Sequence, residues 1–364
     1  MVAQALQSAG VPKFPIASPA SPSCPPRHGL RAEPAGMLTG NSPSPWRTLI
    51  VGLGRIGQGY DYDLPASEHV FTHARAFSQD SQFRLVGGVD PDAGARQRFT
   101  TRYGAPAYAS VAEAAVSSPD LVVVATPTEH HLSTVETVLD HCRPVALVCE
   151  KPLAYTLEEA TRLLELCRAH ACAVHVNYMR RTDPTTAELR ARLRNGRIAS
   201  PLKGVVWYSK GLYNSASHFV NLLEDLLGAE PELQQCTEGR ITPTGDPEPD
   251  FTLRFAHGTV SFHALRAEDY FHNSMEWFAP NGRLRYERAG ANAEWFATAP
   301  EQPGGLAVAA ERLPGDFAHI QAHFTRALAL ALAGRPSPVC SGDQALATLR
   351  LLAQLQPFPN PVCT

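Results

Sequence analysis

The stretch Thr48-Leu49-Ile50-Val51-Gly52-Leu53-Gly54-Arg55-Ile56-Gly57 decides the fold of this 364-residue chain. Its first four residues form a short apolar run with β-branched side chains, which is typical of a strand buried on both faces. The GxGxxG that follows is typical of a dinucleotide-binding turn: Gly52 permits the tight turn, Gly54 lets backbone approach a pyrophosphate, and Gly57 lets a helix pack closely. A helix N-terminus would then offer free N–H groups to the phosphates. We expect the glycines and the two residues between the second and the third to line a cofactor site.

A second apolar run, Arg84–Val89, ends at Asp90. An acid at this point can accept both ribose hydroxyls of NAD and would repel a 2′-phosphate, so Asp90 predicts NAD rather than NADP. The alternative for Asp90 is a turn or N-cap residue. The interval from Gly57 to Asp90 is 33 residues, longer than the usual ~20. We interpret the surplus as a loop inserted around residues 60–70.

Two more buried strands are predicted at 121–125 and 145–149, each separated by helical patterns. Alternation of this kind predicts an α/β fold, a doubly wound parallel sheet with its ligand crevice at the carboxyl ends of the strands. Several candidate cofactor contacts fall at these ends besides the glycine motif, namely Asp90, Thr126, Pro127, Glu150 and Lys151.

The second half of the chain has a different pattern. An amphipathic helix at 157–168 and a strand at 173–178 are followed by the strands of an open sheet, predicted at 205–208, 250–255, 259–265, 274–278 and 284–286. Two helices, at 317–332 and 344–355, end the chain. We therefore expect a dinucleotide-binding domain over 46–154 and an α+β domain over 155–364.

Composition restricts the function classes. The chain is 44% hydrophobic with a net charge of −3, which argues against disorder, nucleic-acid binding and attraction to anionic membranes. No apolar run reaches the ~20 residues that span a bilayer. Eight cysteines without a CxxC pair indicate thiols in a reducing cytoplasm. Residues 1–45 hold nine of the 31 prolines and are predicted to be a disordered leader, with an organellar transit peptide as the alternative.

The order of motifs resembles the glucose–fructose oxidoreductase / inositol dehydrogenase (Gfo/Idh/MocA) family. The resemblance rests on GLGRIG at Gly52–Gly57, ATPTEHH at Ala125–His131, EKPL at Glu150–Leu153, NYMRRTDP at Asn177–Pro184 and GLYNSASHFVNLL at Gly211–Leu223. It implies a Rossmann domain followed by a mostly antiparallel sheet with helices on one face. It also implies a homodimer or homotetramer formed through the other face, and a role for His131 in shaping the cofactor pocket.

The same resemblance implies an NAD(P)-dependent dehydrogenase or reductase acting on a secondary alcohol or ketone of a sugar, polyol or nucleotide sugar. Two other functions stay open for such a chain: a hydrolase or lyase that uses NAD transiently, and a non-enzymatic NAD(H)-sensing regulator. Fold-level analogy does not separate the three.

Lys151 and His218 are the main candidate catalytic residues, and Asn214 is the third. The chain has only four lysines, and a desolvated lysine can lose a proton whereas an arginine does not. The resemblance implies that Lys151 contacts substrate and cofactor. His218 has an unperturbed pKa of ~6.5, which suits a general base, with a hydrogen-bonded buried histidine as the alternative.

The motif around His218 departs from the family. Asn214 replaces the usual aspartate of DxGxH, and Asn221 stands where a second aspartate often follows. We expect His218 to lack a partner that favours its charged form, so that the proton relay uses Lys151, water, Tyr213 or Lys210. The candidate substrate contacts are Lys151, Tyr178, Arg180, Lys210, Tyr213, Asn214 and His218.

Two weaker features complete the pattern. Arg180 and Arg181 could clamp an anionic or hydroxylated substrate, although a solvated pair is the alternative. His69 and His73 are spaced i and i+4 as a metal pair on a helix, but no third ligand has a recognised spacing, so we expect no metal.

Overall fold

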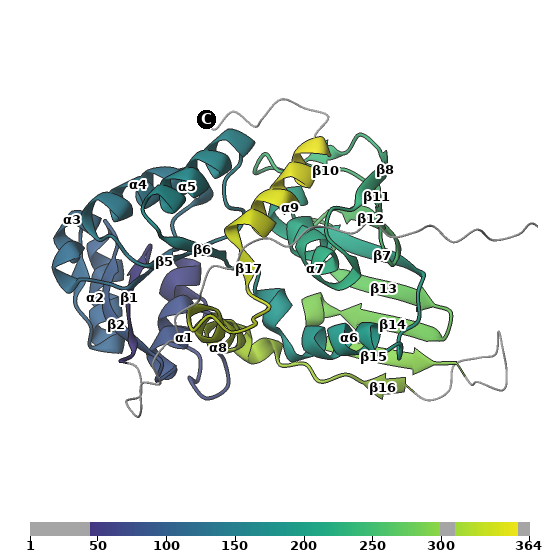
Figure 1. Ribbon diagram of the computed structural model, residues 1–364, viewed down its shortest axis with the longest axis horizontal. Helices are drawn as coiled ribbons and strands as arrows, with labels where there is room; N and C mark the ends of the chain where they lie inside the picture. Colours follow the sequence, from purple (N-terminus) through teal and green to yellow (C-terminus); the bar gives the residue numbers. More distant parts are fainter. Residues whose placement is uncertain (1–43, 299–309, 356–364) are drawn as a thin grey trace, which may run out of the picture. The chain divides into compact units, whose positions relative to one another are not determined.

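The computed structural model describes residues 44–298 and 310–355, which form two main β-sheets and the helices packed on them (Figure 1). The leader expected over residues 1–45 lies outside this part of the chain, apart from its last two residues. Within the described residues, no helix has the length and apolar character needed to cross a membrane.

The first sheet confirms the predicted doubly wound architecture. Its order is β17-β6-β5-β4-β1-β2-β3, and every pair is parallel except β17 with β6. The strands are β1 (Trp46–Val51), β2 (Phe83–Val89), β3 (Ala107–Tyr108), β4 (Leu121–Val124), β5 (Ala146–Cys149), β6 (Ala173–Val176) and β17 (Cys340–Ser341). The order reverses between β1 and β4, so the ligand crevice of this topology lies outside their carboxyl ends.

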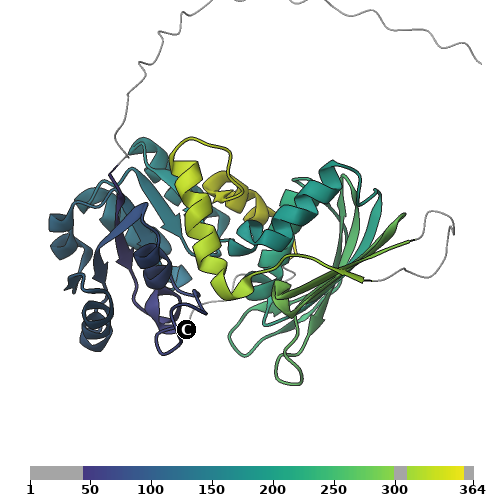
Figure 2. The same cartoon turned by 90° about the horizontal axis from the view of Figure 1, so that it is seen from below.

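Helices cover both faces of this sheet (Figure 2) because successive strand side chains point to opposite sides. Ile50 and Val123 pack toward α1 (His73–Gln79), α2 (Ala93–Tyr103) and α8 (Ile320–Leu332). Leu49 and Val122 pack toward the opposite layer, which contains α3 (Val111–Ala114), α4 (His131–His141), α5 (Leu157–Ala169) and α9 (Gly342–Gln354). Burying each such side chain stabilises the fold by about 2 kcal/mol.

The predicted inserted loop separates the glycine motif from the next α-helix. Only a five-residue π-helical turn, Arg55–Gly59, follows Gly54, and α1 begins at His73. Between them lies the predicted inserted loop, which is held by fully buried Asp61. The Asp61 carboxylate accepts hydrogen bonds from the backbone N–H groups of Phe71 (2.6 Å) and Thr72 (3.0 Å) and from the Thr72 hydroxyl (2.7 Å). The insertion therefore postpones the helix while keeping the loop anchored.

The second sheet has the order β16-β15-β14-β13-β7-β12-β11-β8 and is antiparallel except for the β7–β12 pair. Its strands are β7 (Leu202–Ser209), β8 (Glu232–Cys236), β11 (Phe251–Phe255), β12 (Gly258–Leu265), β13 (Ser274–Ala279), β14 (Gly282–Glu287), β15 (Asn292–Ala297) and β16 (Ala310–Arg312). Helices α6 (Pro184–Arg194) and α7 (Ser217–Leu227) lie on one face, and no described helix covers the other (Figure 2). A small hairpin joins β9 (Arg240–Ile241) to β10 (Pro247–Glu248).

The chain returns to the first sheet after it has built the second. Helix α8 packs beside α1, strand β17 pairs with β6, and α9 packs against both α5 and α7 (Figure 1). Strand β6 also extends the first sheet beyond residue 154, where the sequence placed the end of the first domain. The α5–β6 unit was assigned to the second domain, yet it continues the strand–helix alternation of the first sheet.

Candidate active site

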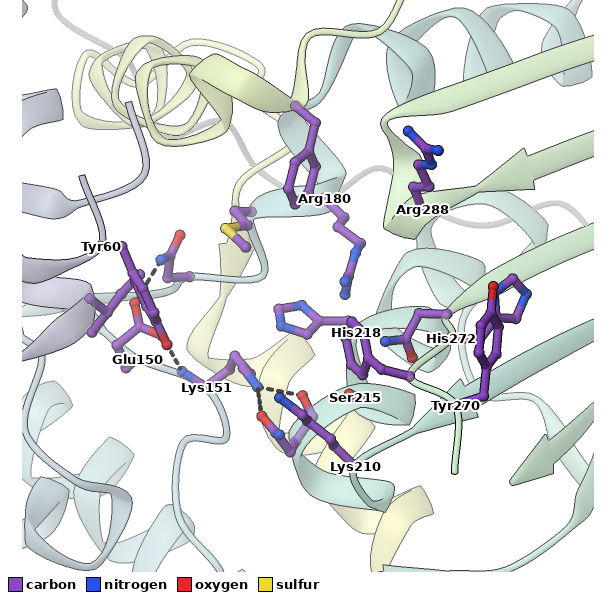
Figure 3. A pocket seen from close by; sticks show the side chains of 17 residues that line it. Tyr60, Glu150, Lys151, Arg180, Lys210, Ser215, His218, Tyr270, His272 and Arg288 are labelled. Atoms are coloured by element: carbon purple, nitrogen blue, oxygen red, sulfur yellow. Dashed lines mark hydrogen bonds between the residues drawn. The ribbon is translucent and has the colours of Figure 1, made fainter. Parts of the chain in front are cut away.

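A cavity of about 720 Å³ lies at the carboxyl end of the first sheet, where residues of the second sheet also reach it (Figure 3). Seven of the residues singled out from the sequence line it: Ile56, Glu150, Lys151, Arg180, Lys210, Asn214 and His218. Both candidate catalytic side chains are therefore brought together from segments that are far apart in the chain.

The glycine motif borders this cavity and fits a dinucleotide. Gly52 has φ of 97°, and a Cβ there would lie 2.5 Å from the carbonyl oxygen of Ala125, so only glycine permits this turn. A Cβ on Gly54 would meet no atom within 4 Å, which leaves open space beside the backbone for a ligand. The Thr126 backbone lies beside Gly52, and its buried hydroxyl has no hydrogen-bond partner among the described residues. An open glycine loop next to an unsatisfied hydroxyl is suited to a polar phosphate-bearing group.

Asp90 has a structural contact that the sequence did not reveal. Its Oδ2 accepts a hydrogen bond of 2.8 Å from the N–H of Leu53, inside the glycine motif. Its Oδ1 accepts one of 2.8 Å from the N–H of Asp92, which is itself the N-cap of α2. A carboxylate has further lone pairs, so these bonds leave acceptors for ribose hydroxyls. The turn role is observed, and the ribose role stays a prediction.

His131 is fully buried behind the cavity rather than in its lining. Its two ring nitrogens each lie 3.1 Å from a carbonyl oxygen, one of Thr126 and one of Leu153. Burial lowers its pKa, although these two contacts oppose the shift. His131 thus braces the loop after β4 against the loop after β5, while Pro127 beside it is exposed.

Glu150 is held as a carboxylate by two side chains. Its Oε1 lies 2.7 Å from Nε2 of His73 and accepts a hydrogen bond of 2.7 Å from Nδ2 of Asn177. Burial disfavours its charged form, but the contacts with His73 and Asn177 and the charge of Lys151 outweigh this and lower its pKa. His73 is therefore engaged with Glu150, and His69 precedes α1 instead of sharing a helix face with it. The described residues contain no group of three or more metal-ligating side chains.

Lys151 bridges the two parts of the site. Its Nζ donates to the backbone carbonyl oxygen of Asn214 at 2.5 Å and lies 3.3 Å from the Asn214 side-chain oxygen. Burial lowers its pKa to about 8, with Glu150 and Asp246 opposing the shift and Arg180 adding to it. The ammonium is therefore mostly charged at neutral pH and can titrate just above it.

His218 lies in the first turn of α7 with its ring directed into the cavity (Figure 3). The ring is edge-on to Tyr178, with centroids 5.8 Å apart, and its buried Nδ1 has no hydrogen-bond partner among the described residues. Burial, reinforced by the charges of Arg180 and Lys151, lowers its pKa well below the usual value. The imidazole is therefore neutral at pH 7.

Asp246 was not singled out from the sequence. It lies in the turn between β9 and β10, and its two carboxylate oxygens accept hydrogen bonds from the N–H groups of Tyr213 (3.0 Å) and Asn214 (2.9 Å). Burial raises its pKa to about 6 despite these bonds and the nearby charge of Lys151. Nothing in the local pattern at Asp246 marks it, because its importance comes from a contact more than 30 residues away.

The remaining candidates divide between the cavity and the core. Tyr178 and Tyr213 are buried beside the lining, and the Arg180 guanidinium lies over the Phe219 ring at 5.2 Å. The proposed clamp role of Arg181 is wrong: its guanidinium donates to both the side chain and the backbone of Asn221, at 2.6 and 3.0 Å. These buried contacts pull Arg181 away from the cavity.

Several lining residues escaped sequence analysis, namely Tyr60, Tyr270, Phe271, His272, Asn273, Arg288 and Phe317. They come from turns and strand connections, where no periodicity marks a residue as facing a site. Tyr60 alone carries a signal, because it begins the predicted inserted loop, three residues after the glycine motif.

Comparison with known proteins agrees with this geometry. Residues 46–178 match the family described as "Oxidoreductase family, NAD-binding Rossmann fold". The rhizopine catabolism protein MocA of Rhizobium meliloti is 27% identical over 156 residues, 43% of this chain and 44% of that protein. Inositol 2-dehydrogenase of Acidothermus cellulolyticus is 29% identical over 193 residues, 51% and 52% of the two chains. The chain spans about half the length of the curated relatives it matches.

Solved structures share the fold over more of the chain. The WlbA dehydrogenase from Bordetella pertussis, in complex with NADH and UDP-GlcNAcA, has a TM-score of 0.68 at 19% identity, covering 87% of this chain and 96% of that one. Aldose-aldose oxidoreductase from Caulobacter crescentus, complexed with glycerol, has a TM-score of 0.68 at 19% identity, with 85% and 96% covered. The first part of the chain, residues 46–178, thus matches an NAD-binding Rossmann family of oxidoreductases. This match agrees with the resemblance to the Gfo/Idh/MocA family that the motif order indicated.

Proposed function

We propose that this protein is an NAD-dependent oxidoreductase that transfers hydride between nicotinamide and a secondary alcohol or ketone of a sugar, polyol or nucleotide sugar. The observation that carries the proposal is the convergence of Lys151 and His218 in one cavity at the carboxyl end of the parallel sheet. Relatives and structural neighbours named above support the same reaction class, because they are described as dehydrogenases or oxidoreductases.

The two side chains have complementary protonation states. His218 is neutral at pH 7 and can take the hydroxyl proton of an alcohol through a ring nitrogen. Lys151 is mostly protonated and can donate a hydrogen bond to the same oxygen, stabilising charge that develops there. Asn214 accepts from Lys151 and keeps its Nζ at the cavity wall.

NAD supplies the hydride chemistry when bound, and the protein supplies position and proton transfer. The residues that would hold it are the glycines and Ile56 at the pyrophosphate, Asp90 at the adenosine ribose, and Thr126 with Glu150 and Lys151 nearer the reacting end. The Asp90 carboxylate favours NAD over NADP by charge.

Several wider assignments belong to the same proposal. The free thiols among the described cysteines suit a cytoplasmic enzyme. The helix-free face of the second sheet exposes Trp207 (40%) and Phe278 (53%), which suits self-association into a homodimer or homotetramer. We assign cofactor binding mainly to residues 46–154, whose sheet is extended by β6 and β17, and substrate binding and oligomerisation to the remainder of 155–364.

The decisive experiment incubates the purified full chain with NAD and a panel of sugars, polyols and sugar nucleotides while NADH absorbance is followed. Wild type should produce NADH with at least one substrate, and His218→Ala should lower kcat by at least about 100-fold. NADH binding, measured by fluorescence titration, should persist in His218→Ala. The control is His170→Ala, which changes an exposed histidine at the end of α5.

The other two functions predict different results. A hydrolase or lyase with transient redox chemistry would form product with no net NADH, and a regulator would bind NADH and turn over nothing. Undiminished turnover by His218→Ala would remove this residue from the mechanism.

A further inference from the structure

We propose that the substrate of this site carries an anionic group, a carboxylate or a phosphate, which Lys210 and Arg288 bind on the second-sheet side of the cavity. This inference rests on the proposed function, because it assumes that the cavity holds the substrate. It adds the charge of the substrate, which the hydride-transfer chemistry alone does not determine.

The cavity has an excess of positive charge. Lys151, Arg180, Lys210 and Arg288 line it, while Glu150 is its only carboxylate among the described lining residues. Glu150 is already engaged by His73 and Asn177. Like charges gathered in a partly desolvated cavity repel each other, and binding of an anion relieves that repulsion.

Lys210 and Arg288 lack the carboxylate partners that other cations of this part of the fold possess. No ion pair joins either of them to a carboxylate within the part of the chain that the structure describes; Lys210 Nζ instead lies 4.8 Å from the Phe271 ring centre. By contrast, four arginines of the second sheet and its hairpin each pair with a glutamate: Arg240, Arg254, Arg283 and Arg285. Lys210 and Arg288 thus differ from these four arginines in having no ion pair and in lining the cavity.

The backbone at both positions is also unusual. Lys210 has φ of 69° and Arg288 has φ of 50°, two of the six non-glycine residues with positive φ in the described chain. This conformation costs free energy for a side chain with a Cβ and is concentrated at functional sites. Lysine is scarce in this sequence, yet two of the three lysines in the described segments, Lys151 and Lys210, line this cavity.

The phosphates of the cofactor do not account for these two cations. The pyrophosphate is expected at Gly52–Gly57 in the first sheet, whereas Lys210 follows β7 and Arg288 follows β14 of the second. Arg288 lies across the cavity from Tyr60 and Glu150 (Figure 3). Tyr270 and Phe271, 72% and 57% exposed, add aromatic surface to the lining against which a sugar ring or a base can pack.

The test measures binding of matched neutral and anionic ligands to the full chain saturated with NADH. The pairs are D-glucose with D-glucuronate, D-glucose with D-glucose 6-phosphate, and N-acetylglucosamine with UDP-N-acetylglucosamine, each titrated by calorimetry. At least one anionic ligand should bind at least about tenfold more tightly than its neutral partner, because charge-assisted hydrogen bonds add about that much affinity. The arm that shows the preference identifies carboxylate, phosphate monoester or diphosphate as the anion.

Two variants assign the preference to these residues. Arg288→Gln and Lys210→Gln should each reduce the ratio of anionic to neutral ligand affinity about tenfold. Their matched controls are Arg285→Gln, on the strand that precedes Arg288, and Lys203→Gln, on the strand that precedes Lys210. Equal affinity for neutral and anionic ligands, or an equal loss of preference in variants and controls, would overturn the inference. The proposed function would fail separately, through absence of NADH production from every substrate.

Discussion

The Asp246 carboxylate accepts a 2.9 Å hydrogen bond from the backbone N–H of Asn214, the residue that replaces the aspartate common in this family. A negative charge is therefore present next to the altered motif, although it comes from the β9–β10 turn. The same carboxylate favours the charged form of Lys151, which bonds to Asn214 from the other side. Asp246 thus acts as a positioning residue for the 211–215 turn and as a charge partner for Lys151.

Asp246→Asn should lower kcat/KM about tenfold, because it weakens two backbone hydrogen bonds at the turn that holds Lys151. It should also move the alkaline limb of the pH–rate profile to lower pH, since loss of the carboxylate lowers the Lys151 pKa from about 8. The measurement is kcat/KM between pH 5 and 10. Asp250→Asn is the control, because Asp250 also accepts a backbone N–H bond, but from Ala264 of β12 instead of from the 211–215 turn. A fall in rate without movement of the limb would mean that Asp246 acts only on folding of the turn.

Asn214→Asp should have the opposite effect on the alkaline limb. A carboxylate at this side chain, whose oxygen lies 3.3 Å from Lys151 Nζ, raises the Lys151 pKa above about 8 by stabilising the ammonium. Activity that requires protonated Lys151 should then persist to higher pH, by about one unit. Asn195→Asp, at the exposed end of α6, is the control for the added charge. An unmoved limb would show that Lys151 is not the group that titrates there.

Asp90→Ala should reduce the ratio of kcat/KM with NAD to kcat/KM with NADP by at least about tenfold, because the variant no longer repels a 2′-phosphate. It should also weaken NADH binding, since the N–H of Leu53 loses its acceptor in the glycine turn. Both constants are obtained from initial rates and fluorescence titration. Asp92→Asn tests the neighbouring carboxylate, which caps α2 instead. An unchanged cofactor ratio would exclude Asp90 from the ribose site.

Glu224→Gln should make the folded state less sensitive to pH. Burial raises the pKa of Glu224 to about 7, although the Thr348 hydroxyl donates to it. The folded state therefore binds a proton more tightly than the unfolded state, and its stabilisation is complete below about pH 4.5 and lost as pH rises toward 7. The loss amounts to about 3 kcal/mol at most. Urea unfolding at pH 5 and pH 8 should show a smaller difference for this variant than for wild type or Glu165→Gln; equal differences would contradict the assignment.

Sequence predicted the first sheet well because its signals are local. Buried parallel strands are short apolar runs, and the glycine turn is restricted by contacts as close as 2.5 Å between a Gly52 Cβ and Ala125. The inserted loop before α1 was predicted from the long interval between Gly57 and Asp90, although nothing local indicated that Asp61 would anchor it. Strand identity is encoded by neighbouring residues, whereas the path of the insertion depends on a buried carboxylate.

The site was predicted where residues follow strands or belong to the motifs, as with Lys151 and His218. Residues of the site were missed where they act through a partner that is distant in the sequence. Asp246 and Arg288 lie in turns whose positions depend on the whole second sheet. Arg181 was misjudged for the same reason, because its partner Asn221 lies 40 residues away and turns the guanidinium inward.

The return of the C-terminal segment to the first sheet has a consequence for dissecting this protein. Phe324 and Leu328 of α8 complete the apolar layer against Phe77 and Val123, and β17 supplies the last edge strand beside β6. A fragment that stops at residue 154 would expose that layer and lose that edge, so the nucleotide-binding half is not an excisable module. The N-terminal half completes its core only after α8 and β17 have been synthesised, so we expect a fragment without them to lose the fold that forms the cofactor site.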